Sequence, residues 1–349
     1  MLAFTQRTGT PWLDKHCLAG EAKRLWPDLA AKIDEASATT AKGHSNWDTT
    51  LRRSPWTAAP LGPSLSTMTA YQHITVSPIA GALGAEIGGV DIAAGLDDAT
   101  IAEIRRALLE HLVVFLRDQK LDDRSHKEFS RRFGRLFIHP NFDLGQADPE
   151  IVRVVRQPGD ERIIGEDWHS DTTMMAEPPM GAILYALEVP PHGGDTLFAN
   201  QYLAYETLSD GMKAMLAGLK VVHSDIKVAG PHNKLNARRS SKIREDANWQ
   251  ATESVHPAVR THPETGRKCL FVNRSYAMRF DGMTERESAP LLEFLMEHGH
   301  RPEFTCRFRW QAGSIAFWDN RCTKHLAVHD AGPFRRRLQR TQIAGDAVV

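Results

Sequence analysis

The sequence is poor in cysteine and has no long hydrophobic run. Its four cysteines lie far apart among 349 residues, and none of them forms a CxxC pair. Both a disulfide framework and a zinc knuckle are therefore disfavoured, and we expect a reducing, cytoplasmic location. No stretch approaches the roughly 18 apolar residues of a membrane-spanning helix, and the N-terminus lacks the basic and then apolar pattern of a secretion signal. We therefore expect no membrane partner.

An excess of charge of either sign is also missing. The 43 basic residues balance the 43 acidic residues, so the formal net charge is zero. Proteins that bind nucleic acid usually carry a basic surface, and the overall charge gives no sign of one. The apolar share of 42% and the charged share of 25% are typical of a globular domain with a substantial core. We expect a small molecule rather than nucleic acid as the ligand.

The first 67 residues differ in composition from the rest of the chain. They are rich in Ala, Thr, Ser and Pro, which predicts a poorly ordered N-terminal extension. Met68 precedes a more compact pattern and is a candidate for the true start, and residues 68–349 are predicted to form one domain. Within that domain, residues 230–254 are polar and contain NARRSSKIR. This composition indicates a solvated loop or, as the functional alternative, a mobile lid.

Hydrophobic periodicity after residue 68 predicts many short strands and few helices. Ile101, Ile104 and Leu108 repeat at helical spacing, and Thr284 with Glu287 forms a capping box before another helix. The expected helices are 100–116, 125–133, 201–217 and 284–298. The expected strands are 150–155, 181–189, 195–200, 221–228, 269–275, 304–310, 314–319 and 335–343. This pattern favours an antiparallel sandwich or barrel, so the predicted class is mainly β with flanking helices.

The tripeptide HSD occurs twice, at 169–171 and at 223–225. His-x-Asp with a distant histidine supplies two imidazoles and one carboxylate, the facial set that leaves three positions open on non-haem iron(II). A zinc hydrolase uses similar ligands but usually keeps one position open. In a chain with 16 histidines, about one His-x-Asp is expected by chance. The surrounding sequence must therefore decide between the two copies.

The surroundings favour the first copy as a metal motif. Residues 223–225 lie in VVHSDIKV, whose alternation predicts an ordinary strand with no third ligand nearby. The first copy lies in GEDWHSDTTM, between two expected strands and before GGDT. Among the distant histidines, His325 stands just past the apolar strand SIAFW, and His329 is its nearest competitor. The sequence therefore predicts one metal held by His169, Asp171 and His325.

Several segments, taken in order, resemble the taurine dioxygenase (TauD/TfdA) family. They are WHSDTT, GGDTLFAN, HPETGRK, and WDNRCTKH followed by RRRLQR, and the resemblance covers about residues 73–346. It implies a double-stranded β-helix, or jelly-roll, core. It also implies that His169, Asp171 and His325 hold iron(II), with 2-oxoglutarate and dioxygen as cosubstrates.

An arginine is the natural anchor for the far carboxylate of 2-oxoglutarate, because its planar guanidinium can bind a carboxylate through two N–H groups. Arg336 lies on the expected strand that follows His325. Its neighbours Arg335 and Arg337 are expected on the opposite face, where a solvated edge strand would accommodate them. The resemblance implies that Arg336 and Thr196 bind 2-oxoglutarate.

Arg340 shares a strand face with Arg336, because alternate strand residues point the same way. Two cations on one inward face repel each other unless each meets an anion, which indicates a second anion at the site. The resemblance implies that Arg340, His139 and Phe142 contact the substrate.

Four positions depart from the pattern of taurine enzymes. Phe142 replaces a tyrosine, Gly165 an asparagine, Lys324 a glutamine and Ala331 another aromatic residue. Loss of a hydroxyl and an amide from a polar pocket should weaken recognition of a small zwitterion. A larger and more apolar anion is therefore expected, such as a sulfonate, a sulfate ester or an aryloxyalkanoate.

The resemblance thus implies an oxidoreductase, a 2-oxoglutarate-dependent dioxygenase that hydroxylates a small organic anion and releases succinate and CO2. We expect hydroxylation rather than halogenation, because Asp171 fills the position that a halide would need. A homo-oligomer is also predicted. Three alternatives stay open: taurine dioxygenase proper, a zinc-type hydrolase with no need of Arg336, and a metal-binding jelly-roll module without catalysis.

Overall fold

The structure, a computed structural model, describes residues 70–141, 148–230, 234–243 and 248–349. The predicted extension and its boundary at residue 68 lie outside these ranges. Phe142 and parts of the predicted loop at 230–254 lie outside them as well. Residues from Ala70 to Val349 belong to one structural unit.

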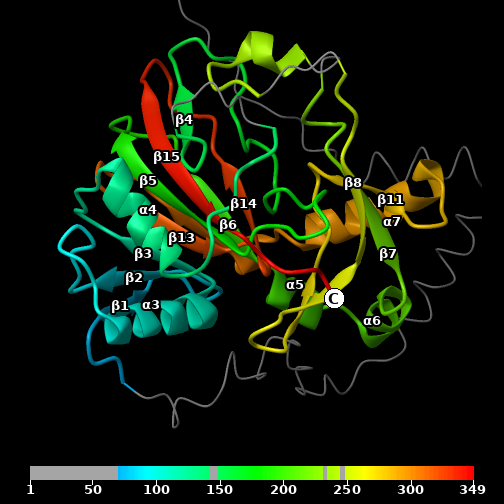
Figure 1. The fold of residues 1–349 in the computed structure, drawn as a ribbon. Coiled ribbons are helices and arrows are strands. Elements are labelled where there is room, and N and C mark those ends of the chain that lie inside the picture. Colours follow the sequence, from blue (N-terminus) through cyan, green and yellow to red (C-terminus); the bar gives the residue numbers. More distant parts are fainter. Residues whose placement is uncertain (1–69, 142–147, 231–233, 244–247) are drawn as a thin grey trace, which may run out of the picture. The chain divides into compact units, whose positions relative to one another are not determined.

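Two packed β-sheets form the centre of this unit (Figure 1). The larger sheet has seven strands in the order β1-β2-β3-β13-β5-β15-β4, and the smaller has the order β12-β6-β14. Every pairing in them is antiparallel except that of β2 with β3. The strands of the larger sheet are β1 (Thr75–Pro78), β2 (Ala85–Gly88), β3 (Val113–Leu116), β13 (Ile315–Asp319), β5 (Gly181–Glu188), β15 (Arg336–Ile343) and β4 (Val152–Arg156). Those of the smaller sheet are β12 (Thr305–Phe308), β6 (Thr196–Asn200) and β14 (Thr323–Ala327).

Side chains along the central strands alternate between two hydrophobic cores. In β5, Ile183 packs on the outer face beneath α3 (Asp98–His111) and α4 (Asp123–Arg131). Its neighbour Leu184 packs on the inner face, in the same cluster as Phe198 of the smaller sheet. Successive strand residues point to opposite faces, so one strand serves both cores. The result is a two-sheet sandwich with helices covering one side.

The same alternation orients the arginines of β15. Leu338 belongs to the inner core. Arg336 and Arg340 lie two residues before and two residues after it, so their side chains point to the same inner face. Both arginines are buried. Arg335 and Arg337 are partly exposed and lie beside an acidic residue at the end of β5. The predicted division of this arginine run between two faces is therefore present.

A third hydrophobic cluster lies on the side of the smaller sheet that carries the remaining elements. There β11 (Ala277–Phe280), β7 (Lys220–Ser224) and β8 (Glu253–Pro257) form one sheet, and β10 (Lys268–Leu270) pairs with β9 (Val259–Thr261). The helices are α5 (Gln201–Glu206), α6 (Asp210–Leu216) and α7 (Glu285–His298), and the short 3-10 turns are η2 (Lys234–Arg238) and η3 (Pro302–Phe304). The capping box predicted for α7 is confirmed, since Thr284 accepts from Glu287 N–H and Glu287 from Thr284 N–H.

Two predicted helices were wrong in their extent. The first ends at His111, where Leu112 adopts a left-handed φ of 66°, and the next residues form β3. Three of these four residues, VVFL, are β-branched or aromatic, and all four are buried in the sheet, an environment that favours a strand. The helix expected at 201–217 is divided into α5 and α6 because Ser209 caps a new helix.

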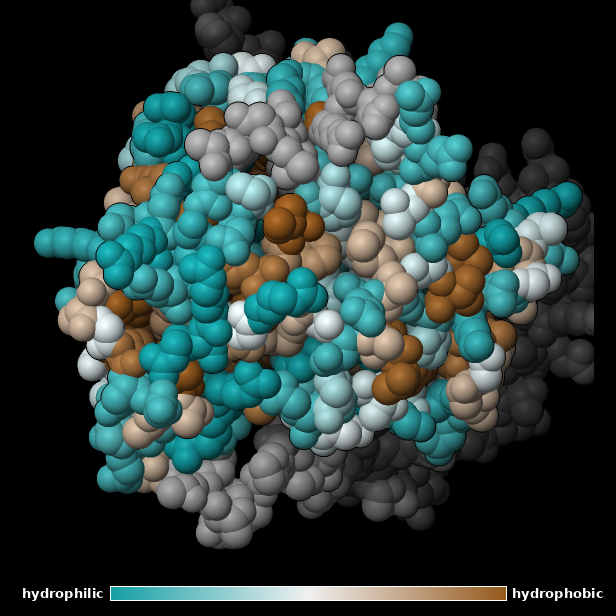
Figure 2. All heavy atoms as spheres, viewed as in Figure 1, coloured by the Kyte–Doolittle hydropathy of each residue, from teal (hydrophilic) through white to brown (hydrophobic). Residues whose placement is uncertain are grey.

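Several strands also differ from the prediction. The strand expected at 269–275 is the shorter β10, which ends at Leu270. β7 ends at Ser224, so Asp225 lies in the turn that follows rather than on the strand. His325, expected just past a strand, lies on its own strand β14. Figure 2 shows one face of the molecule as mostly hydrophilic, with hydrophobic side chains in small separate groups. In the part of the chain that the structure describes, no helix is long and apolar enough to cross a bilayer.

Candidate metal centre

The backbone brings the two predicted histidine ligands together. His169 and His325 exchange two N–H···O=C bonds, of 3.0 Å and 2.8 Å, and their ring centroids are 4.1 Å apart. Asp171 follows on the same segment. One ligand atom from each of these three residues lies within 4.8 Å of the other two, and all three residues are buried. The predicted constellation therefore exists, and His329 lies outside it.

The ligand atoms suit a divalent metal. His169 donates its Nδ1–H to the carbonyl of Asp167 at 2.7 Å, which leaves the Nε2 lone pair for a metal. Asp171 Oδ1 lies 3.7 Å from His169 Nε2 and 4.0 Å from His325 Nε2. Asp171 Oδ2 is buried and has no hydrogen-bond partner among the residues that the structure describes. Two imidazoles and one carboxylate are the set typical of non-haem iron(II), so the residues present fit this ion.

Asn320 holds the metal motif in place, and sequence reasoning missed it. Its side-chain oxygen accepts from the Asp171 N–H at 2.6 Å, and its Nδ2 donates to the carbonyls of Asp171 and Pro179. Thr172, the next residue, has a left-handed φ of 50°, which is costly for a β-branched side chain. Asn320 therefore fixes a strained turn beside the site. Its place within WDNRC was the one available signal.

Arg340 contacts the candidate ligand Asp171. One terminal nitrogen of Arg340 donates to Asp171 Oδ1 at 2.9 Å. Burial alone would raise the pKa of Asp171, but the charge of the adjacent Arg340 holds that pKa well below its usual range. The carboxylate is therefore ionised, as a metal ligand must be. The second anion expected beside Arg340 is, in this structure, Asp171 itself.

Arg336 lies at the other end of β15, and its surroundings are those expected of a side chain that binds an anion. Its Nε and one terminal nitrogen are buried and have no hydrogen-bond partner in the described part of the chain. Burial lowers the pKa of Arg336 to about 10, although the nearby Asp195 opposes this. Trp310 lies beneath the guanidinium at 5.7 Å and donates to Thr196 Oγ1 at 3.0 Å. A carboxylate would satisfy these donors. The assignment of Arg336 and Thr196 to 2-oxoglutarate stays a prediction.

The glycines of GGDT make room for this anchor. Gly194 has a φ of 68°, and a Cβ there would lie 3.2 Å from Arg336 Cδ. Its N–H donates to Asp330 at 2.6 Å. A cavity of about 20 Å³, enough for about one water molecule, lies beside Arg336 and is bordered by Ala331. The departure from the taurine pattern at Ala331 therefore lies in the wall of the cavity beside Arg336.

On the substrate side, His139 is buried close enough to Arg340 for their charges to interact. Burial first, and then the charge of Arg340, lower the pKa of His139 to about 3, so this imidazole is neutral. Its Nδ1 accepts from the backbone N–H of Asn141 at 3.1 Å. The Asn141 side chain in turn donates to Asp225 at 2.8 Å. Phe142, the third predicted substrate residue, lies outside the described residues.

The second HSD copy supports this site without joining the metal cluster. His223 is fully buried, and its Nδ1 hydrogen bonds with Thr173 Oγ1 at 2.9 Å, just after the metal motif. Asp225 accepts from Asn141 and from the Thr252 N–H. The copy therefore links β7 to the metal turn and to the segment that carries His139.

Two other departures from the taurine pattern have structural explanations. Gly165 has a φ of 80°, and a Cβ there would lie 3.1 Å from Cε1 of His169. A side chain at this position would meet the imidazole, so the chain presents only backbone there. Lys324 is buried on the face of β14 opposite His325, near Gly299, and burial lowers its pKa to about 7. This lysine therefore does not point at the metal cluster.

A second buried cluster, His262, Asp319 and Cys322, also has metal-ligand spacing. Its donor atoms are already engaged, because Arg321 donates to both oxygens of Asp319. His262 Nε2 lies 3.0 Å from Asp319, and its Nδ1 accepts two backbone N–H groups. These contacts describe an ion-paired core network rather than a second metal site.

Comparison with known proteins agrees with this geometry. Residues 75–342 match the sequence profile of the family described as taurine catabolism dioxygenase TauD, TfdA family. The chain belongs to this family. The predicted family, the jelly-roll class and the dioxygenase class are thus confirmed.

Individual relatives cover most of the chain. The alkylsulfatase of Acinetobacter baylyi is 34% identical over 280 residues, which are 80% of this chain and 87% of that protein. The alpha-ketoglutarate-dependent sulfate ester dioxygenase of Pseudomonas putida is 33% identical over 288 residues, 82% of this chain and 94% of that one. A crystal structure of a taurine dioxygenase from Burkholderia xenovorans matches with a TM-score of 0.68 and 40% identity, covering 80% and 91% of the two chains.

Proposed function

We propose that this protein is an iron(II)- and 2-oxoglutarate-dependent dioxygenase that hydroxylates a small organic anion, with an alkyl sulfate ester as its substrate class. The observation that carries the proposal is the placement of two arginines on the inner face of β15. Arg336 presents unpaired, buried donors, and Arg340 lies against the candidate metal ligand Asp171 at 2.9 Å. One anchor would hold the cosubstrate, and the other would hold the substrate beside the metal.

Each residue then has a defined task. His169, Asp171 and His325 would hold iron(II), which, when bound, uses dioxygen and 2-oxoglutarate to oxidise the substrate. Arg336 would bind the far carboxylate of 2-oxoglutarate through paired N–H groups, and Thr196 would add a hydroxyl. The buried walls around these side chains would exclude water.

The anionic group of the substrate would be held by Arg340 and His139, and Phe142 would contact the apolar part of the substrate. Because His139 is neutral, it would donate a hydrogen bond to the substrate anion without adding a positive charge to the site. A guanidinium that already contacts Asp171 would bridge this carboxylate and the substrate anion, fixing their separation. Such bridging would orient the substrate toward the metal at little entropic cost.

The sulfate ester class is favoured over taurine for two reasons. First, Gly165 has no side chain that could bind an ammonium group beside His169. Second, the relatives from Acinetobacter baylyi and Pseudomonas putida are named for alkyl sulfates or sulfate esters. Hydroxylation of the carbon that bears the ester oxygen replaces C–H by C–OH. The C–O bond between this carbon and the sulfate group then breaks and gives an aldehyde and bisulfate. The second oxygen atom of dioxygen enters succinate, which forms from 2-oxoglutarate with release of CO2.

The test is anaerobic loading with iron(II) and 2-oxoglutarate, followed by air and one substrate at a time: hexyl sulfate, hexanesulfonate, phenoxyacetate or taurine. We expect succinate and hexanal in equal amounts from hexyl sulfate, and at least tenfold less turnover with taurine. Succinate formed fastest with taurine would contradict the substrate class. No substrate-dependent succinate from any of the four would contradict the function.

We also place this protein in the cytoplasm, as a homo-oligomer. The described cysteines, Cys269, Cys306 and Cys322, are all buried and unpaired, which suits a reducing compartment. Cell fractionation would test the location, and sedimentation of the purified protein would test the oligomeric state.

A further inference from the structure

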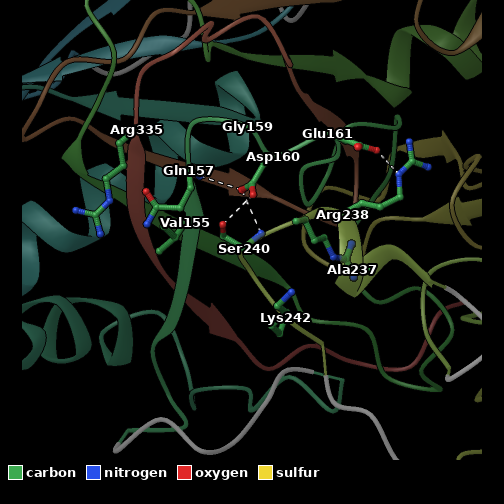
Figure 3. Close-up of a pocket in the computed structure, with 11 residues that line it drawn as sticks. Val155, Gln157, Gly159, Asp160, Glu161, Ala237, Arg238, Ser240, Lys242 and Arg335 are labelled. Atoms are coloured by element: carbon green, nitrogen blue, oxygen red, sulfur yellow. Dashed lines mark hydrogen bonds and ion pairs between the residues drawn. The ribbon is translucent and has the colours of Figure 1, made fainter.

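A second pocket lies outside the metal cluster, at the edge of the larger sheet (Figure 3). It has a volume of about 670 Å³ and lies between residues 155–161 and residues 237–242, with Arg335 at one side. Hydrogen bonds tie its two walls together. Ser241 Oγ donates to the carbonyl of Val155 and accepts from its N–H, so it caps the exposed edge of β4.

Further bonds fix the centre of the pocket. Asp160 accepts from the N–H and the hydroxyl of Ser240 and from the N–H of Gln157, as Figure 3 shows. Glu161 of the first wall and Arg238 of the second form an ion pair of 2.7 Å. The pocket is therefore a bonded structure between two segments rather than a gap between loose side chains.

Arg239 lines this pocket, and two of its nitrogens have no hydrogen-bond partner among the described residues. Its side chain is among the buried ones, with the residue 8% exposed. Within the described residues, its Nε and one terminal nitrogen are buried and have no hydrogen-bond partner. Buried guanidinium donors without partners lose their hydration and gain nothing in return. Such donors indicate an anion that the described residues do not supply.

The other charged groups around the pocket do not answer this need. Four described lining residues are cationic and two are acidic: Arg238, Arg239, Lys242 and Arg335 against Asp160 and Glu161. Glu161 is paired with Arg238, and Asp160 is used by the wall contacts. Lys242 donates to a backbone carbonyl and Arg335 lies near Glu188. The pocket is thus electropositive, with both of its acids engaged.

We propose that this pocket binds the oxyanion group of a ligand, a sulfate, phosphate or carboxylate, through Arg239. It is a second anion site, formed by different elements from those that carry Arg336 and Arg340. The anion has two possible sources: a free inorganic ion, or the far end of a substrate charged at both ends. Val155 borders both this pocket and the cavity beside Arg336.

The test is calorimetric titration of inorganic sulfate into the full chain, anaerobically loaded with iron(II) and 2-oxoglutarate so that Arg336 is occupied. We expect the Arg239→Gln variant to bind sulfate at this site at least tenfold more weakly than the wild type. The matched control, Arg238→Gln, lies in the same pocket but is exposed and already paired, and it should change the affinity less than twofold. Equal binding by the wild type and Arg239→Gln would overturn the proposal.

Two further measurements keep the result clear. If Arg239→Gln does not fold, Arg239→Lys retains the charge and should keep part of the affinity, while a sulfate affinity equal to the wild type would overturn a guanidinium site. For the source, KM is compared between hexyl sulfate and hexane-1,6-diyl disulfate. A KM rise in Arg239→Gln for the disulfate alone assigns the site to the substrate's far end. Unchanged KM values with lost sulfate binding assign it to a free anion. The titration needs no turnover, so its outcome is independent of the proposed reaction.

Discussion

Replacing Arg336 by methionine should have opposite effects on stability and on cosubstrate binding. Burial lowers the pKa of Arg336 from 12.5 to about 10. At about 1.4 kcal/mol for each pKa unit, the folded, cosubstrate-free protein bears a cost of roughly 3 kcal/mol for this charge. Because the unfolded chain holds the proton more tightly, the cost is present at every pH below about 10.

Methionine removes the charge but also the contact with Trp310, at 5.7 Å from the guanidinium. That contact contributes about 1 kcal/mol, which leaves a net gain of roughly 2 kcal/mol in the free energy of unfolding. The affinity for 2-oxoglutarate should fall about 100-fold, since charge-assisted hydrogen bonds worth roughly 3 kcal/mol are lost.

Urea unfolding of the protein without metal or 2-oxoglutarate measures the first quantity, and calorimetric titration of 2-oxoglutarate into the iron-loaded, oxygen-free protein measures the second. Arg335→Met is the matched control, because Arg335 is partly exposed on the opposite face. It should change both quantities little. An Arg336→Met variant that is less stable and binds 2-oxoglutarate as the wild type does would refute the reasoning.

Three further predictions concern the surroundings of the metal cluster. Gly165→Ala should weaken iron(II) binding at least tenfold in equilibrium dialysis, since the new Cβ would meet the His169 ring at 3.1 Å; wild-type affinity would contradict this. Asp225→Ala should raise the substrate KM about tenfold with little change in kcat, because it releases the segment that carries His139; a loss confined to kcat would count against it. His223, whose pKa burial lowers to about 3, stays neutral while its unfolded form binds a proton below pH 6.5. Stability is therefore lost as the pH falls, by about 1.4 kcal/mol at pH 5.5. His223→Asn should reduce by about 1.4 kcal/mol the difference in the free energy of unfolding between pH 8 and pH 5.5, measured by urea unfolding. A variant with the same difference as the wild type would contradict this role of His223.

Sequence reasoning succeeded where local pattern and spatial role coincide. The sequences of β5, β6 and β13 are largely apolar, which is typical of buried strands. The capping box at Thr284 marks the start of α7. The order of the HSD, GGDT and arginine motifs predicted the grouping of His169, Asp171 and His325 that the structure shows. These signals are local, so tertiary packing did not override them.

Other features depend on contacts between distant segments, which no local pattern encodes. The stretch VVFL continues a helical periodicity, but its burial between two strands makes it β3. Asn320 becomes a clamp only because β13 ends beside the metal turn. The contact between Arg340 and Asp171 joins residues 169 positions apart. Likewise, Arg239 looked like a solvated charge in a polar loop, and only its burial against residues 155–161 reveals unmet donors.

The most direct test of the metal centre is anaerobic iron(II) binding by the wild type and by Asp171→Ala. In the wild type, one tightly bound iron per chain is expected, together with succinate production that depends on both 2-oxoglutarate and hexyl sulfate. In Asp171→Ala, iron affinity should fall at least 100-fold and succinate production should cease, while far-ultraviolet circular dichroism stays unchanged. An Asp171→Ala protein that binds iron and turns over like the wild type would contradict the assignment of His169, Asp171 and His325 as the metal ligands.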